Sequence, residues 1–144
     1  MKNKGFTLME LLGVIVILAI IALITIPVTY NIIKTSREKA FVDTGYSIID
    51  AAKQTQTKNA GKNITLDLFI NYTTKENIDK IELKGTLPDS GSLHIDENGK
   101  TELKLWSKKA NICITKSLED KKIIINKELK QENCILISNG ESNE

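Results

Sequence analysis

One long apolar segment near the N-terminus constrains the fold of this chain more than any other feature of its sequence. From Phe6 to Val28 the only charged residue is Glu10. As an α-helix the segment would be about 34 Å long, enough to cross a hydrocarbon layer of about 30 Å. It is apolar on all sides, which is typical of a membrane span or a buried core helix. A secretory signal peptide fits less well, because its apolar region is shorter and ends at a small-residue cleavage site.

The helical pattern continues beyond this expected span over residues 6–28. Between Ile33 and Ala52 apolar residues recur at helical spacing, with charged residues between them. This pattern predicts an amphipathic continuation of the helix over residues 29–58, ended by a stop signal around Gly61. Pro27 lies within the joined helix and predicts a kink there, because proline cannot donate the helical hydrogen bond.

Residues 59–90 are expected to form a connecting region of mixed α and β character. The apolar cluster Leu66–Ile70 fits a short helix or a short strand equally well. The following segment up to Leu83 suggests a short helical turn. Leu87–Gly91 has the composition of a turn. This region therefore joins the helix to whatever fold the C-terminal part adopts.

Residues 91–137 are predicted to form a small antiparallel sheet. Ser92–Asp96 and Lys100–Trp106 both alternate between apolar and polar residues. A three-residue loop at 97–99 puts Leu93 opposite Leu103 and Ile95 opposite Thr101, whereas a two-residue loop would face apolar residues with charged ones. Further strands are expected at 111–117 and 122–127, a short edge strand at 135–137, and a flexible tail at 138–144. The predicted fold class is α+β, with a long N-terminal helix packed on a small antiparallel sheet head.

The charge balance gives no support to nucleic-acid binding. The formal net charge is +2, and removing residues 1–5 would remove Lys2 and Lys4 and leave 18 basic against 18 acidic residues. Aromatic residues make up 5% of the chain, so base-stacking surfaces are not expected. DNA as a partner therefore has no support in the sequence.

The chain has two cysteines, Cys113 and Cys134, with no histidine near them. Their spacing does not suit a zinc site, which usually needs four clustered ligands. In an exported protein we expect one Cys113–Cys134 disulfide. The alternative is two free buried thiols in the cytosol.

The segment from Lys4 to Leu12 carries the functional signal: a basic residue, Gly5, the aromatic Phe6, and Glu10 four residues later. It closely resembles the N-terminal signature of type IV prepilins and type II secretion pseudopilins, and Pro27 also stands where such proteins often carry a kinking proline. The resemblance covers residues 1 to about 30. It implies that residues 1–5 are a leader facing the cytoplasm, that prepilin peptidase cuts after Gly5, and that the new Phe6 amine is methylated.

Glu10 has a physical role consistent with this resemblance. A carboxylate deep in an apolar helix costs about 2.5–3.5 kcal/mol on insertion scales, and a plain anchor has no use for that penalty. A neighbouring subunit displaced along a fibre would pair its Phe6 amine with this carboxylate. Cleavage should survive loss of Glu10, because the cut lies one helical turn away. The alternative role is that Glu10 favours the N-terminus of its own helix near the membrane interface.

No enzyme site is expected. His94 is the only histidine and alternates onto the outer face of the first hairpin, where a solvated side chain is predicted. The Asp96–Gly99 stretch lacks the remaining positions of an EF-hand loop and is interpreted as a turn. We find no phosphate-binding loop and no paired catalytic carboxylates, so no cofactor, metal or activity is predicted.

The sequence therefore favours a structural subunit that is processed and polymerises into a type IV pilus or pilus-like filament. Its expected partners are other pilins, prepilin peptidase/N-methyltransferase, an inner-membrane assembly platform and membrane lipid. It would be a single-pass protein of the cytoplasmic membrane before assembly and part of an extracellular filament afterwards. A type II secretion pseudopilin or a competence pilin is one alternative. A single-span, surface-anchored binding domain that never polymerises is the other.

Overall fold

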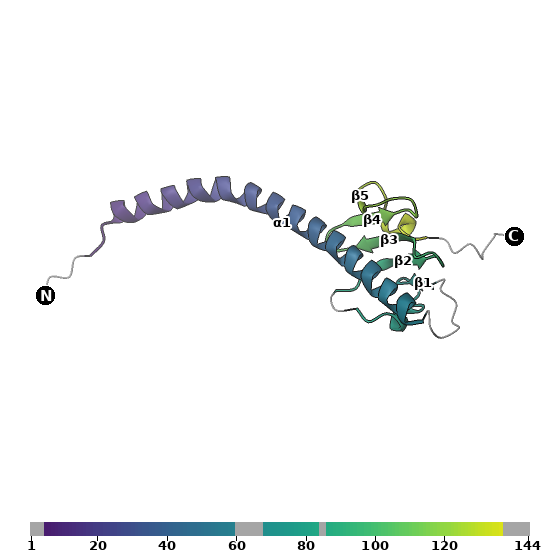
Figure 1. Cartoon of the computed structure of the whole chain (residues 1–144). Coiled ribbons are helices and arrows are strands. Elements are labelled where there is room, and N and C mark those ends of the chain that lie inside the picture. The colour runs from purple at the N-terminus through teal and green to yellow at the C-terminus, as the bar shows by residue number, and fades with distance from the viewer. Residues whose placement is uncertain (1–4, 60–67, 84–85, 137–144) are drawn as a thin grey trace. The chain divides into compact units, whose positions relative to one another are not determined.

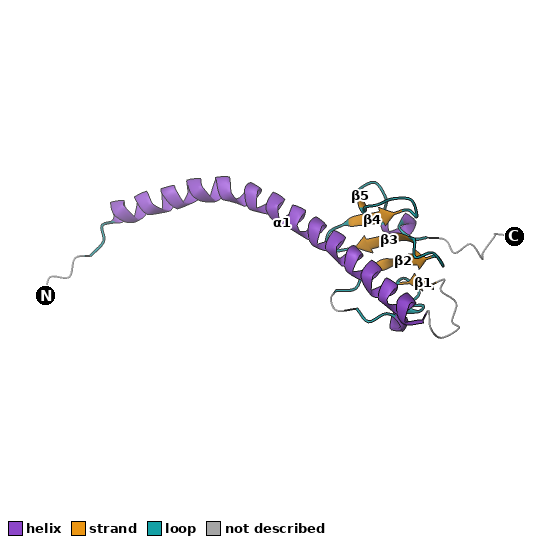
Figure 2. Ribbon diagram, in the orientation of Figure 1, coloured by secondary structure: helices purple, strands orange, loops and turns teal. Residues whose placement is uncertain are grey.

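The computed structural model describes residues 5–59, 68–83 and 86–136 and has an α+β fold. One helix, α1 (Leu8–Asn59), is followed by a five-stranded antiparallel sheet, as Figures 1 and 2 show. The chain divides into two compact units, Met1–Ser36 and Arg37–Glu144. We call the described part of the second unit the head.

In the first unit α1 begins at Leu8 and continues on both sides of Pro27. The hydroxyls of Thr25 and Thr29 donate hydrogen bonds to the carbonyls of Ile21 and Thr25, at 2.8 and 2.9 Å. These polar side chains are thus satisfied by the helix itself, as an apolar environment requires. The kink expected at Pro27 stays a prediction.

The head contains a sheet in which each strand pairs with the next along the chain. The strands are β1 (Leu68–Asn71), β2 (Ser90–Ile95), β3 (Thr101–Ser107), β4 (Ile112–Lys116) and β5 (Ile124–Asn126). Two short 3₁₀ helices, η1 (Ile78–Lys80) and η2 (Gln131–Asn133), lie outside the sheet. All four strand pairings are antiparallel and join strands that are consecutive along the chain, so the sheet needs no crossover connection.

The hairpin between β2 and β3 has the register that its sequence predicts. Leu93 pairs with Leu103 and Ile95 with Thr101. Gly99 adopts a φ of +77°, the left-handed conformation that this loop needs. The Asp96 carboxylate accepts hydrogen bonds from the backbone amides of Asn98 and Lys100, at 3.0 and 2.7 Å, which explains the acidic residue at this turn.

The core of the head lies between the second half of α1 and one face of the sheet. The helix contributes four buried apolar side chains, and the strands contribute alternate residues, as their twofold periodicity dictates. Buried members include Phe41, Ile48, Ile49 and Ala52 from the helix and Leu93, Ile95, Leu103, Leu105 and Ile114 from the sheet. This burial confirms that a helix followed by a small sheet can form one packed domain.

The structure also decides the segments that the sequence leaves ambiguous. Residues Leu68–Asn71 form a strand rather than a helix and extend the sheet beyond the region predicted for it. The short edge strand expected at 135–137 does not form at Ile135 and Leu136, and Ile137 lies outside the described residues. The leader residues 1–4 and the tail 138–144 also lie outside them.

A second, smaller cluster covers the opposite face of the sheet. Trp106 and Cys113 from neighbouring strands pack there against Cys134 and Leu129. The C-terminal segment 129–136 therefore crosses the outer face of the sheet instead of adding a strand to its edge.

Candidate functional site

The residues around the expected cut are outside the helix and exposed. Gly5, Phe6 and Thr7 have no helical structure, and α1 begins immediately after them. The Phe6 side chain is 84% exposed. A Cβ placed on Gly5 would meet no heavy atom within 4 Å. A peptide bond in such a segment can be reached by an enzyme without unwinding a helix.

Thr7 and Glu10 form a reciprocal set of hydrogen bonds at the helix start. The Thr7 amide and hydroxyl both donate to Glu10 Oε2 at 2.9 Å. In return the Glu10 amide donates to the Thr7 hydroxyl at 3.3 Å. The Thr7 carbonyl accepts from the Leu11 amide, which makes Thr7 the N-cap residue. This arrangement is a capping box, and it orders the Glu10 side chain.

The capping box is a site feature that our sequence interpretation missed. Its signal was available, because a threonine followed three residues later by a glutamate, before an apolar run, is the signature of such a box. The sequence interpretation favoured a neighbouring subunit as the partner of Glu10 and kept a role at its own helix N-terminus as the alternative, without naming Thr7. The structure supplies a partner within the same chain as well.

The apolar helix surface beyond Glu10 has no cover within the described chain. Every large apolar side chain from Leu8 to Ile33 is exposed. By length and composition the helix could cross a membrane, and none of its most apolar stretch is buried. A core helix of a soluble domain would bury that stretch, whereas this exposed stretch fits a membrane anchor.

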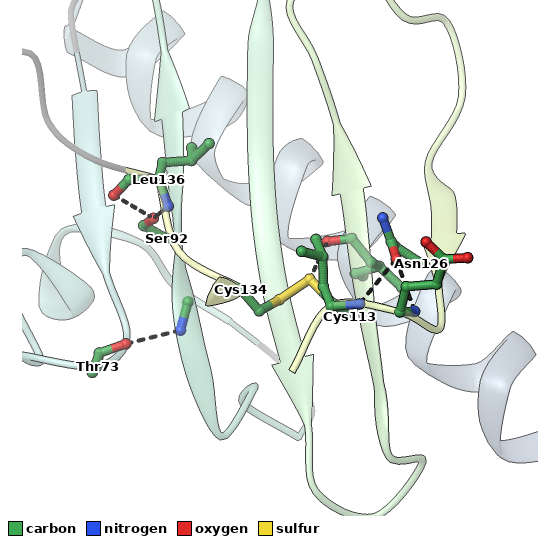
Figure 3. Close-up of a disulfide and its surroundings, with 10 residues drawn as sticks. Thr73, Ser92, Cys113, Asn126, Cys134 and Leu136 are labelled. Atoms are coloured by element: carbon green, nitrogen blue, oxygen red, sulfur yellow. Dashed lines mark hydrogen bonds between the residues drawn. A yellow bond between two sulfur atoms is a disulfide. The ribbon is translucent and has the colours of Figure 1, made fainter. Parts of the chain in front are cut away.

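The cysteine pair forms the disulfide expected of an exported protein. Figure 3 shows the bond between Cys113 in β4 and Cys134. Their Cα atoms are 5.9 Å apart. Nearby, the Ser92 hydroxyl accepts a hydrogen bond from the Leu136 amide at 2.7 Å. Asn126 Oδ1 accepts from the Glu128 and Leu129 amides, at 3.0 and 3.1 Å. The C-terminal segment is thus linked to the sheet by one disulfide and by hydrogen bonds.

Other charged groups of the head have structural partners. Glu38 is buried and forms an ion pair with Lys127, whose Nζ lies 3.0 Å from Oε1. Hydrogen bonds from the Ser117 hydroxyl and amide lower the pKa of the Asp120 carboxyl. Burial lowers the pKa of the Lys116 ammonium, with repulsion from Lys53 adding to the effect. These groups stabilise loops and strand ends, and we assign them no chemistry.

His94 is more enclosed than the sequence predicts. It is partly buried, with Nδ1 3.8 Å from a Glu102 carboxylate oxygen and its ring 6.4 Å from that of Phe69. Across the described ranges, no group of three His, Cys, Asp or Glu side chains is arranged to hold a metal ion. His94 is therefore described as a cross-strand contact of the sheet.

Comparison with known families identifies the N-terminal region. Residues 1–26 match the model of the prokaryotic N-terminal methylation motif, which is the signal motif of type IV pilins and pseudopilins. The match includes Gly5, Phe6 and Glu10 and ends just before Pro27. Searches of curated proteins and of solved structures found no significant match.

The matched motif and the exposed apolar helix together indicate which kind of protein this chain resembles. The motif supports a type IV pilin-like prepilin subunit, and the long apolar helix fits a membrane-anchored protein of this kind. Proteins with this motif are usually structural and not enzymes. The motif implies processing by prepilin peptidase and assembly with other pilins.

Proposed function

We propose that the chain is a structural subunit of a type IV pilus or pilus-like filament. It is cut after Gly5, methylated on the Phe6 amine, and polymerised through its N-terminal helix. Before assembly it spans the cytoplasmic membrane once, with the leader inside. After assembly it lies in an extracellular filament with the head facing outward.

One observation carries this proposal: the single carboxylate of the apolar segment, Glu10, lies one helical turn from the expected cut. The apolar surface of its helix is not covered by any described residue. A charge at such a position costs about 2.5–3.5 kcal/mol on insertion scales. A helix that served only as an anchor would insert more favourably with an apolar residue at this position. A role in assembly explains why the charge is present.

Cleavage would create the partner for this carboxylate. Removing residues 1–5 converts the Phe6 amide into a free amine, which is positively charged at neutral pH. In a fibre, the Phe6 ammonium of one subunit would meet Glu10 of a neighbour displaced along the axis. The two charges would neutralise each other in the apolar fibre core, and their pairing would select one axial register.

The apolar surface explains why such a polar pair is needed. Lipid tails are as apolar as leucine or isoleucine side chains, so exchanging lipid for helix contacts yields little hydrophobic gain. Packing and polar contacts between helices then direct association. Glu10 and Phe6 would supply the directional contact, and the uncovered surface of residues 8–33 would supply the packing.

The disulfide of the head supports a location outside the cytoplasm. This Cys113–Cys134 bond forms in oxidising compartments. The prepilin peptidase/N-methyltransferase and an inner-membrane assembly platform would act before export of the head into the filament. A pseudopilin of type II secretion or a competence pilin would use the same N-terminal chemistry, and the neighbouring genes would distinguish these roles.

Mass analysis of membrane and filament fractions tests the proposal. We expect the filament protein to begin at a methylated Phe6, with residues 1–5 missing. Gly5→Ala should still be cut, whereas Gly5→Leu should accumulate as precursor, because the peptidase must admit a small side chain there. A filament protein that still begins at Met1, or an extract without filaments from cells with all assembly genes, would contradict the proposal.

A further inference from the structure

The capping box leaves one oxygen of the Glu10 carboxylate available. Both side-chain and backbone donors of Thr7 bind Oε2, at 2.9 Å each. Among the described residues, no hydrogen bond reaches Oε1. The carboxylate is therefore held on one side and open on the other, on a helix surface that the described part of the chain does not cover.

From this geometry we propose that Thr7 is a positioning residue for filament assembly. Its hydroxyl and amide hold Glu10 so that Oε1 faces a second copy of this chain, whose Phe6 ammonium would occupy the open side. The inference rests on the function proposed above and adds a specific residue to it. Thr7 itself touches no neighbouring ammonium in this arrangement and acts through Glu10.

Preorganisation is the physical reason for such a role. A free glutamate side chain loses rotamer freedom when it is fixed in a contact, and this loss opposes assembly. A carboxylate that is already ordered by its own helix avoids that loss when the neighbour arrives. Because the hydroxyl donates to the ionised oxygen, it also stabilises the charged form that an ammonium needs.

The position of the box makes it compatible with processing. Thr7 and Glu10 both lie after the expected cut at Gly5, so the box persists in the mature chain. The box fixes the start of the helix at Leu8 and leaves Phe6 two residues before that start. The new amine would therefore project from a fixed helix end rather than from a frayed one.

The test compares full-length variants expressed with the complete assembly machinery. Thr7→Val keeps the side-chain shape but removes the hydroxyl, and Thr7→Ser keeps the hydroxyl. Filament yield is measured per cleaved subunit, so that effects on processing are separated from effects on assembly. We expect Thr7→Val to lose roughly 2- to 30-fold in yield, the range that loss of a cap interaction corresponds to, and Thr7→Ser to restore it.

Thr25→Val is the matched control, because its hydroxyl also lies in the apolar helix but bonds the Ile21 carbonyl and not Glu10. It should form filaments normally. The inference is overturned if Thr7→Val assembles like the wild type, if Thr7→Ser is equally defective, if Thr25→Val loses as much, or if reduced cleavage accounts for the whole loss. A defective Glu10→Val with a normal Thr7→Val would overturn this inference alone. A normal Glu10→Val would overturn the assembly role of Glu10 itself.

Discussion

The two halves of helix α1 differ in where their stability comes from. Residues 37–59 belong to the head and bury Phe41, Ile48, Ile49 and Ala52 against the sheet. Residues 8–36 bury no large apolar side chain within the described chain. The first kind of surface is satisfied by the fold of one chain. The second needs lipid before assembly and, as we propose, other subunits afterwards.

Two glutamates on this helix show the same difference for charge. Glu38 in the head is buried, and Lys127 of the same chain neutralises it. Glu10 is exposed and is held through one oxygen by its own helix start. The Glu38 carboxylate thus has its ion-pair partner within the head. The Glu10 carboxylate has no such partner among the described residues, and we propose that it pairs with another subunit.

The largest expected effect is on assembly. Glu10→Val should abolish or greatly reduce filaments, while membrane insertion, cleavage and head folding persist. The unpaired Phe6 ammonium in the fibre core would cost about 3–5 kcal/mol per subunit, the usual loss when one member of a buried pair is truncated. Electron microscopy and immunoblots of sheared fractions measure filaments and precursor. Co-expression with the wild type should give a graded defect, and wild-type filament yield from Glu10→Val alone would contradict the prediction.

A matched pair of glycine substitutions should separate the two regions by stability. Gly91 in β2 has a φ of +117°, and a Cβ there would meet the backbone carbonyl of Lys104. Gly91→Ala should therefore destabilise the head by roughly 3–5 kcal/mol through strain and overpacking. Gly13→Ala in the apolar helix meets nothing within 4 Å and should leave head unfolding unchanged. Denaturant unfolding in detergent, followed by Trp106 fluorescence, distinguishes them.

Loss of the disulfide should weaken only the head. Replacing Cys113 and Cys134 by serine removes a cross-link with a sequence separation of 21 residues. In the chain-entropy model this loses about 3 kcal/mol. The same unfolding measurement applies, with limited proteolysis expected to cut first in the released segment 129–136. Two alkylatable thiols in unreduced exported protein would show instead that the bond does not form in the cell.

The smallest expected effect concerns Tyr72. Its hydroxyl is buried and has no hydrogen-bond partner in the described part of the chain. Tyr72→Phe should therefore change the free energy of unfolding by no more than about 1 kcal/mol, in the stabilising direction. Urea unfolding of both proteins at neutral pH measures the difference. A loss of several kcal/mol would mean that the hydroxyl does have a partner.

The same substitution has a pH signature. Burial raises the pKa of Tyr72 above its ordinary value of 10.0. The unfolded chain then loses this proton first as the pH rises, so the stability that the neutral phenol contributes is full below pH 10.0 and is lost above it. The alkaline decline in stability should be shallower in Tyr72→Phe. Equal declines would contradict the effect of burial.

Much of the candidate site follows from local sequence patterns. One continuous segment contains the span, the expected cut, Glu10 and Pro27. Its length, hydropathy and residue order are enough to predict these features. The β2–β3 register is also local, because only one loop length puts Leu93 and Ile95 on one apolar face. The Thr7–Glu10 box had a local signal too, although the interpretation of Glu10 as an intermolecular partner passed over it.

What the tertiary structure alone decided depends on contacts between distant residues. Leu68–Asn71 became a strand because the edge of β2 was available to pair with it, although its own pattern fitted a helix equally well. Segment 129–136 lies across the sheet, and not at its edge, because Cys134 is tied to Cys113 and Leu136 to Ser92. The sequence by itself determined which surface of the chain needs a partner. The fold determined how the head buries its apolar side chains and pairs its strands, since both need segments that are distant in the sequence to meet.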